Sequence, residues 1–170
     1  MLIMCGYPFS GKSTLAGRIS EVFGMRVVAV DDLHVRHGTA AETDQIANRD
    51  WLLAYKAAHR DAERCLTNAE SVIFDSVGYT RKDRDRLRRI AGRHRASSLV
   101  VWLDVSASDA RRRLERNRKQ RQRANVPVVN FLQIVSRFEA PAGDEATVIY
   151  RSNDDPGEWI NQTLRTAMNS

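Results

Sequence analysis

Short apolar runs alternate with longer amphipathic stretches along this chain, and the alternation sets the expected fold. Runs that are apolar on both faces are typical of strands in a parallel sheet that is covered on both sides. They predict five strands, at residues 2–5, 26–30, 71–74, 98–103 and 146–150. We therefore expect an α/β protein with a five-stranded parallel sheet between two helical layers, a three-layer αβα arrangement.

The stretches between these runs have the apolar spacing of helices that cover a sheet. Gly24 and Thr80 provide a helix end and a helix start, and either Ser106 or Ser108 caps the helix after the fourth strand. Residues 33–47 are polar and predict an irregular segment. The helices are expected at 12–23, 49–66, 81–95, 107 to about 125, 130–138 and 156–168. In the helix at 49–66, the buried face is expected to carry Trp51, Leu52, Tyr55, Ala58, Ala62 and Leu66.

The length of 170 residues suits one domain with a buried core and is short for two, so a single domain over 1–170 is expected. The longest apolar run, at 99–103, is far too short to span a bilayer. Residues 1–6 show no signal-peptide pattern, and Cys5 and Cys65 have neither metal-ligand spacing nor a disulfide framework. We expect a cytoplasmic protein without a membrane partner, monomeric or homodimeric, with Cys5 in its core.

The net charge of +6 is unevenly distributed. Residues 81–123 contain 16 Lys and Arg against 5 Asp and Glu, whereas the rest of the chain is acidic overall. Such an excess is typical of an anionic partner, including nucleic acid, or of solvated helix faces. For most of these arginines we favour solvated faces, and nucleic acid binding stays open.

Residues 6–13 read GYPFSGKS and match the phosphate-binding pattern G-x-x-x-x-G-K-[ST], between an expected strand and an expected helix. The glycines allow a tight turn whose N–H groups point at phosphate oxygens, and the helix adds its positive end. Lys12 is expected to reach the β- and γ-phosphates, and the Ser13 hydroxyl to ligate Mg²⁺. Tyr7 and Phe9 are expected to pack within the loop. The residues expected to bind nucleotide here are Gly6, Ser10, Gly11, Lys12, Ser13 and Thr14.

Carboxylates follow two of the expected strands, where ligands of open α/β sheets bind. Asp31 and Asp32 follow the second strand, and Asp75 follows the third. Asp31 is the candidate base that accepts the proton of an acceptor hydroxyl. Asp32 shares that task, contacts the acceptor, or caps the following turn. Asp75 holds Mg²⁺ through its shell or orients the acceptor, with a structural turn as the alternative.

Eight basic residues crowd into 111–123, and they cannot all lie on one helix face. In a phosphotransferase, one or two of them close over the triphosphate and stabilise the charge that develops in the transition state. Arg116 and Arg121 are the candidates for this catalytic role.

These motifs together resemble the small P-loop kinases with a nucleoside-monophosphate-kinase-like fold, especially the kinase domain of polynucleotide 5′-hydroxyl kinases. Zeta toxins and chloramphenicol phosphotransferase are more distant relatives in this resemblance. It rests on residues 6–13, 30–32, 74–76, Arg116-Asn117 with Arg121, 126–127, and 138–141 with Glu145. It implies a sheet order 2-3-1-4-5, Asp31 as general base, a lid over about 111–127 containing Arg121, and adenine near 151–153, with Asn153 as a contact.

Two departures from the polynucleotide kinase pattern lie on the acceptor side. His34, with Arg36 nearby, stands where those enzymes have an acceptor-binding arginine, and the asparagine expected two residues after Asp75 is replaced by Val77. We therefore expect an ATP- and Mg²⁺-dependent kinase for a small hydroxyl-bearing acceptor, contacted by Asp32, His34, Arg36 and Asp75. His34 is equally consistent with a solvated loop position. A polynucleotide 5′-hydroxyl kinase and a non-catalytic nucleotide-binding module are the alternatives.

Overall fold

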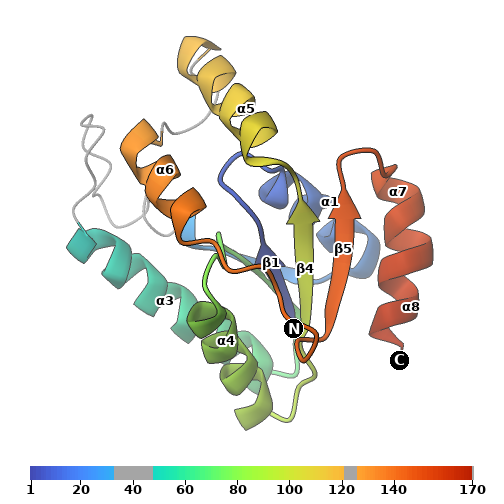
Figure 1. The fold of residues 1–170 in the computed structure, drawn as a ribbon. Coiled ribbons are helices and arrows are strands. Elements are labelled where there is room, and N and C mark those ends of the chain that lie inside the picture. The colour runs from blue at the N-terminus through green and yellow to red at the C-terminus, as the bar shows by residue number, and fades with distance from the viewer. Residues whose placement is uncertain (33–47, 121–125, 170) are drawn as a thin grey trace.

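A five-stranded, all-parallel sheet forms the centre of the molecule (Figure 1). The computed structural model describes residues 1–32, 48–120 and 126–169. The strands lie side by side in the order β2-β3-β1-β4-β5, which confirms the expected fold class and strand order. Their bounds are β1 (Leu2–Cys5), β2 (Arg26–Ala29), β3 (Val72–Asp75), β4 (Leu99–Asp104) and β5 (Thr147–Arg151).

Helices cover both faces of the sheet because successive strand side chains point to opposite sides. Leu2 and Met4 of β1 join the core beneath α1 (Lys12–Phe23) and the C-terminal helical segment. Ile3 and Cys5 join the core on the other face, and Cys5 is fully buried as expected. That second face is covered by α3 (Asn48–Thr67) and α4 (Arg81–Arg93).

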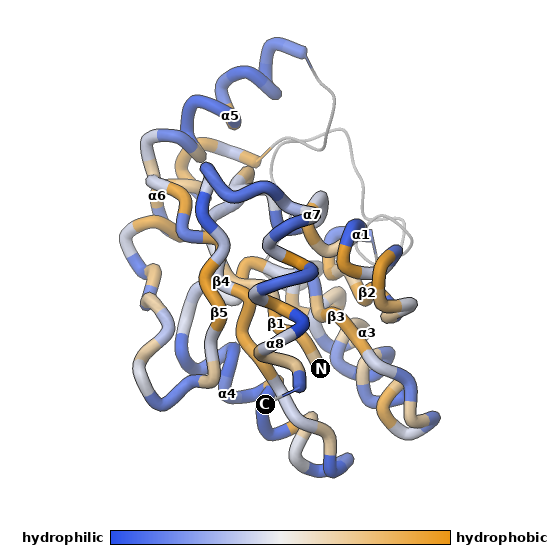
Figure 2. The backbone as a smooth tube through the Cα atoms, turned by 90° about the vertical axis from the view of Figure 1, so that its right-hand side faces the viewer, coloured by the Kyte–Doolittle hydropathy of each residue, from blue (hydrophilic) through white to orange (hydrophobic). Residues whose placement is uncertain are grey.

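Two further helices lie beyond the carboxyl ends of the strands (Figure 1). They are α5 (Ala107–Gln120) and α6 (Val128–Ser136). Ala110, Leu114 and Phe131 form a small core between them, against which Tyr7 and Phe9 pack, as expected for these two loop residues. The remainder of α5 is strongly hydrophilic (Figure 2), so this helix contacts the molecule only along one narrow face.

Several strands extend further than their apolar runs. β3, β4 and β5 end at Asp75, Asp104 and Arg151, one residue beyond the expected ends, because ladder hydrogen bonds join backbones whatever the side chain. β2 is one residue shorter than expected, since Val30 already has helical backbone together with Asp31 and Asp32.

The expected buried face of α3 needs one correction. Leu52 is 52% exposed, and Ala54 takes its place in the core. Ala54, Ala58 and Ala62 recur every four residues, and their small side chains let the helix backbone lie close to the sheet. The buried face of α3 is therefore the one with small side chains, which allow the backbone to lie close to the sheet. Leu52 was predicted to be buried because it is large and apolar.

The expected helix signals are present. Gly24 ends α1 in the left-handed conformation, and the Thr80 and Ser106 hydroxyls accept the N–H groups of Asp83 and Asp109 at the starts of α4 and α5. The C-terminal segment is helical throughout, but a π-helical turn interrupts it. It consists of α7 (Pro156–Trp159), the π segment Ile160–Leu164 and α8 (Arg165–Met168). Across the described ranges, no helix is both long and apolar enough to cross a bilayer.

Candidate active site

The loop between β1 and α1 forms a tight turn that only glycine allows at its two ends. Gly6 has a φ of 148° and Gly11 a φ of 105°. A Cβ at Gly6 would lie 3.0 Å from both the Leu103 carbonyl oxygen and Ser10 Oγ, so the loop packs tightly over β4. Ser10 is buried, and its hydroxyl has no hydrogen-bond partner among the described residues. An enclosed hydroxyl in a ring of backbone amides suits a phosphate oxygen.

Lys12 places its ammonium group inside this loop. Its Nζ donates to the carbonyl oxygens of Gly6 at 3.1 Å and Tyr7 at 2.7 Å, and the residue is only 8% exposed. Burial lowers the pKa of the Lys12 ammonium, and the charges of Asp75 and then Asp31 act in the opposite direction. The carboxylates of Asp75 and Asp31 therefore favour the protonated, positively charged form of Lys12.

Ser13 and Asp75 meet directly, although one begins α1 and the other ends β3. The Ser13 hydroxyl is hydrogen-bonded to the Asp75 carboxylate, which is buried. Burial raises the pKa of Asp75, while the Ser13 hydrogen bond and the Lys12 charge oppose that rise. A hydroxyl and a carboxylate oxygen beside a phosphate-binding loop are the hard ligands that suit Mg²⁺, so these two residues fit the expected metal site.

Asp31 and Asp32 lie exposed at the end of β2 and face the same region. Asp31 acts electrostatically on both Lys12 and Asp75, and Asp32 acts on Asp75. The carboxyl ends of three adjacent strands thus bring these acids to the loop. Of the pair Asp31 and Asp32, Asp31 is the one whose charge acts on Lys12, and it stays the candidate base.

Tyr55 is a neighbour of this site that the sequence analysis assigned only to the core. Its hydroxyl is hydrogen-bonded to the Ser76 side chain, directly after Asp75. Burial raises the pKa of Tyr55, and the charges of Asp83 and Asp31 raise it further. The phenol therefore stays protonated beside Asp31. In the sequence, only the expected position of Tyr55 on the buried face of its helix could have indicated that it lies near the site.

A cavity of about 270 Å³ opens beside the phosphate-binding loop, on the side of α1 and β5. Arg113 of α5 lines it, and its Nη1 donates to the Ser10 carbonyl oxygen at 3.0 Å. Thr14 and Ser152 also line the cavity, whereas Asn153, expected to contact adenine, is exposed and lies outside the lining. The lining residues are Ser10, Gly11, Thr14, Leu15, Arg18, Leu103, Val105, Arg113, Tyr150, Ser152 and Pro156.

Arg113, rather than Arg116, touches the loop in this structure. Arg116 is exposed and forms no hydrogen bond with the described residues. Arg113 follows buried Ala110 by three positions and precedes buried Asn117 by four, so it borders the inner face of α5. That spacing was readable in the sequence. The remaining expected site residues, His34, Arg36 and Arg121, lie outside the described residues.

The family of the chain is shown by comparison with known proteins. A family described as an AAA domain matches residues 1–141, most of the chain. The chain belongs to this AAA domain family. No curated protein sequence matches the chain.

Solved structures show the fold of this AAA domain chain to be that of P-loop kinases. A gluconokinase from Sinorhizobium meliloti 1021 aligns with 99% of this chain and 91% of its own, at 21% identity and TM-score 0.70. Kti12 from Chaetomium thermophilum with ADP-AlF3 aligns over 99% and 97%, at 23% identity and TM-score 0.70. The Mycobacterium tuberculosis APS kinase CysC with AMPPNP and APS aligns over 99% and 96%, at 16% identity and TM-score 0.69. The expected P-loop kinase resemblance is confirmed at the level of fold.

A buried ion pair lies next to the loop that follows β3, close to the site of the AAA domain. Arg84 and Glu145 are both 0% exposed, with Nε donating to Oε2 at 2.7 Å and Nη2 to Oε1 at 2.9 Å. Arg84 Nη1 also donates to the Gly78 carbonyl oxygen at 2.9 Å. Most arginines of 81–123 were expected to be solvated, and Arg84 is an exception. It lies three residues before the buried Leu87 of α4, and that spacing marked it as inward-facing.

The loop that Arg84 holds is bonded to the phosphate-binding loop. Gly6 N donates to the Val77 carbonyl oxygen at 3.1 Å, one residue before Gly78. Gly78 has a φ of 54°, and a Cβ there would lie 2.6 Å from the Met4 carbonyl oxygen. Arg84 and Glu145 thus hold the turn at Gly78, next to the residue that is hydrogen-bonded to the first residue of the phosphate-binding loop.

Proposed function

We propose that this protein is an ATP-dependent kinase that transfers the γ-phosphoryl group to a hydroxyl of a small molecule, with Mg²⁺. The observation that carries the proposal is the meeting of Lys12, Ser13, Asp75 and Asp31 at the carboxyl ends of three adjacent strands. A loop that binds nucleotide without chemistry has no need of Asp31 in electrostatic contact with Lys12. This convergence supports catalysis over passive binding.

The phosphate-binding loop and α1 position the triphosphate. The backbone amides around Gly6 and Gly11, the Ser10 hydroxyl and the Lys12 ammonium surround the β- and γ-phosphates. Ser13 and Asp75 hold Mg²⁺, which neutralises charge on the phosphates when bound. For phosphate to meet Lys12, the ammonium exchanges its hydrogen bonds to the Gly6 and Tyr7 carbonyls for phosphate oxygens.

Asp31 takes the proton in the transfer step. The acceptor oxygen bonds to the γ-phosphorus as its proton passes to the Asp31 carboxylate, and the bond to the bridging oxygen breaks, releasing ADP. Asp32 lies beside Asp31 on the exposed end of β2, where it orients the acceptor. His34 and Arg36 are proposed acceptor contacts, and Arg116 and Arg121 the lid residues that stabilise developing charge.

Adenine is assigned to the cavity that Arg113, Tyr150 and Ser152 line. The cavity shares Ser10, Gly11 and Thr14 with the phosphate-binding loop, so a nucleotide whose phosphates occupy the loop points its base that way. Arg113 already spans the cavity and the Ser10 carbonyl. Its guanidinium offers a flat cationic face to the base.

Two structural neighbours are a gluconokinase and an APS kinase, whose names indicate small-molecule acceptors. This favours a small acceptor for the present chain as well. The test is phosphate transfer from labelled ATP to a panel of sugars, sugar acids, nucleosides and 5′-hydroxyl oligonucleotides. Lys12→Ala and Asp31→Asn proteins serve as inactive controls, and Lys119→Ala as a control for a change of charge on exposed α5. Transfer to a small alcohol that both inactive controls lose supports the proposal. Turnover that survives in the controls, or occurs only with oligonucleotides, contradicts it.

A further inference from the structure

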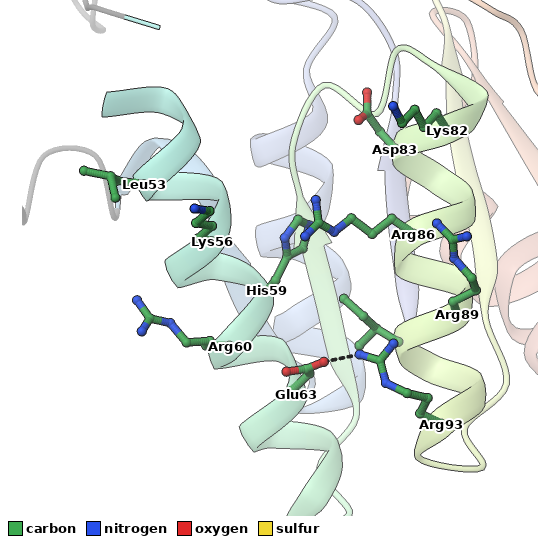
Figure 3. A pocket seen from close by; sticks show the side chains of 11 residues that line it. Leu53, Lys56, His59, Arg60, Glu63, Lys82, Asp83, Arg86, Arg89 and Arg93 are labelled. Atoms are coloured by element: carbon green, nitrogen blue, oxygen red, sulfur yellow. Dashed lines mark hydrogen bonds and ion pairs between the residues drawn. The ribbon is translucent and has the colours of Figure 1, made fainter. Parts of the chain in front are cut away.

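A groove of about 790 Å³ separates α3 from α4 on the face of the sheet away from α1 (Figure 3). The adenine cavity is lined instead by α1, β5 and α5, and the two linings share no residue. Nothing in the proposed transfer reaction uses the groove. Its lining consists of Leu53, Lys56, His59, Arg60, Glu63, Lys82, Asp83, Arg86, Arg89, Ile90 and Arg93.

The charge of the groove is strongly positive. Among the described residues of its lining, six are Lys or Arg and two, Glu63 and Asp83, are acidic. Both acids are engaged already, since Glu63 is paired with Arg93 (Figure 3) and Asp83 accepts the Thr80 hydroxyl. The other five cations form no ion pair within the described ranges: Lys56, Arg60, Lys82, Arg86 and Arg89.

His59 lies at the centre of the groove, between the two helices (Figure 3). Its ring stacks on Phe74 of β3 at 5.4 Å, and Arg86 reaches toward it from α4. The His59 Nδ1 is buried and has no hydrogen-bond partner among the described residues. Burial lowers the pKa of His59 and the Arg86 charge lowers it further, while the charges of Glu63 and Asp83 act in the opposite direction.

The dimensions of the groove indicate a small, multiply charged ligand. The lining of α3 runs from Leu53 to Glu63, about 15 Å at the rise of a helix. The volume lies in the range of small-molecule sites, roughly 300–1,000 Å³. Non-specific sites for single-stranded nucleic acid combine positive charge with stacking aromatic rings, and no Phe, Tyr or Trp is among the described residues that line the groove.

We propose that the α3–α4 groove is a second anion-binding site, for a small molecule that carries two or more phosphate groups. Cations on both walls meet separate phosphate groups along the groove. Arg86 reaches from α4 toward His59 and offers the paired N–H groups that suit phosphate oxygens, and Arg60 adds a further guanidinium group to the lining from α3. This site stands whether or not the nucleotide site catalyses transfer.

Calorimetric titration with tripolyphosphate in a metal-free buffer at low salt tests the proposal. The phosphate-binding loop also takes this probe, so the wild type should show two sites. Lys12→Ala should lose one of them, and Arg60→Gln with Arg86→Gln should weaken the other about tenfold or more. The matched control is Arg64→Gln with Arg95→Gln, which removes the same charge from α3 and from the turn after α4, outside the lining. Thermal unfolding verifies that each variant is folded.

Each outcome separates the two sites. Unchanged two-site binding in the Arg60 and Arg86 variant, or an equal loss in the control, overturns the groove assignment. A wild type whose only binding is insensitive to Lys12→Ala contradicts the nucleotide site and leaves the groove standing. In the Lys12→Ala protein, a short oligonucleotide should not displace tripolyphosphate. Displacement that weakens steeply with salt overturns the assignment to a small ligand.

Discussion

At the scale of single residues, Lys12 has the most direct test because its ammonium group lies inside the loop. We expect Lys12→Ala to abolish the rise in melting temperature that ATP with Mg²⁺ gives the wild type, since a ligand stabilises only the state it binds. Lys119→Ala removes the same charge from an exposed position of α5 and should keep the rise. An undiminished rise in Lys12→Ala would contradict the phosphate-binding role of the loop.

Arg113 and Arg116 lie three positions apart on α5, and replacing them should affect different steps, ATP binding for Arg113 and phosphoryl transfer for Arg116. Arg113 contacts the Ser10 carbonyl and lines the adenine cavity, so Arg113→Gln should weaken ATP binding about tenfold. Arg116→Ala, like Arg121→Ala, should slow transfer more than it weakens binding, because a lid contact matters most when charge moves. Measuring the Kd for ATP and the kcat of the three variants separates an effect on binding from an effect on transfer. An equal loss of ATP affinity in Arg113→Gln and Arg116→Ala would remove the distinction.

At the scale of elements, the Arg84–Glu145 pair joins the start of α4 to the residues before β5. Replacing one partner leaves the other charge buried without a counter-charge, so Glu145→Gln should lower the free energy of unfolding by about 3 kcal/mol. Glu139→Gln is the control, since it changes an exposed carboxylate that accepts one surface N–H. Chemical denaturation at neutral pH measures both.

The same pair makes a prediction about acid. The hydrogen bonds from Arg84 hold the pKa of Glu145 below the ordinary glutamate value of 4.5. A lowered folded-state pKa adds stability that is fully present above that ordinary value and is lost as pH falls through the lowered one. The difference in unfolding free energy between wild type and Glu145→Gln should therefore shrink below about pH 4.5. A difference that stays constant down to pH 3 would contradict this coupling.

The elements also show what the sequence could predict. Each of the five strands was predicted from its short apolar run, and Gly24, Thr80 and Ser106 marked helix ends by local chemistry. Leu52 was misplaced because hydropathy cannot show how closely α3 approaches the sheet. The π-helical turn at 160–164 was not predicted, and this stretch of the C-terminal helix packs into the core through Trp159, Ile160 and Leu164.

The site was predictable to the extent that it follows strand order. Asp31 and Asp75 end neighbouring strands, so a parallel sheet must bring them to the loop between β1 and α1. The Ser13 contact with Asp75 follows from the same geometry. Arg84 and Arg113 were not singled out, because the expectation for the basic residues rested on composition and did not use their spacing from buried positions. Their partners, Glu145 and the Ser10 carbonyl, are distant in sequence.

At the scale of the whole molecule, the excess of basic residues bears on the acceptor. The described arginines of α5 other than Arg113 are exposed, and α5 is hydrophilic along its length (Figure 2). We expect a short single-stranded oligonucleotide with a 5′-hydroxyl to be a poor acceptor even at low salt. Efficient 5′-phosphorylation, with KM rising steeply between about 50 and 200 mM salt, would contradict this and favour a polynucleotide kinase.

Once the panel has identified an acceptor, single-turnover transfer from ATP by wild type and Asp31→Asn measures whether Asp31 takes the proton of the acceptor hydroxyl. The substitution keeps the size of the side chain but removes the carboxylate that takes the hydroxyl proton. Asp32→Asn is the matched comparison at the neighbouring exposed position. We predict that Asp31→Asn slows transfer on the order of 10²-fold or more while its ATP affinity stays near that of wild type. An unchanged transfer rate in Asp31→Asn would contradict the account.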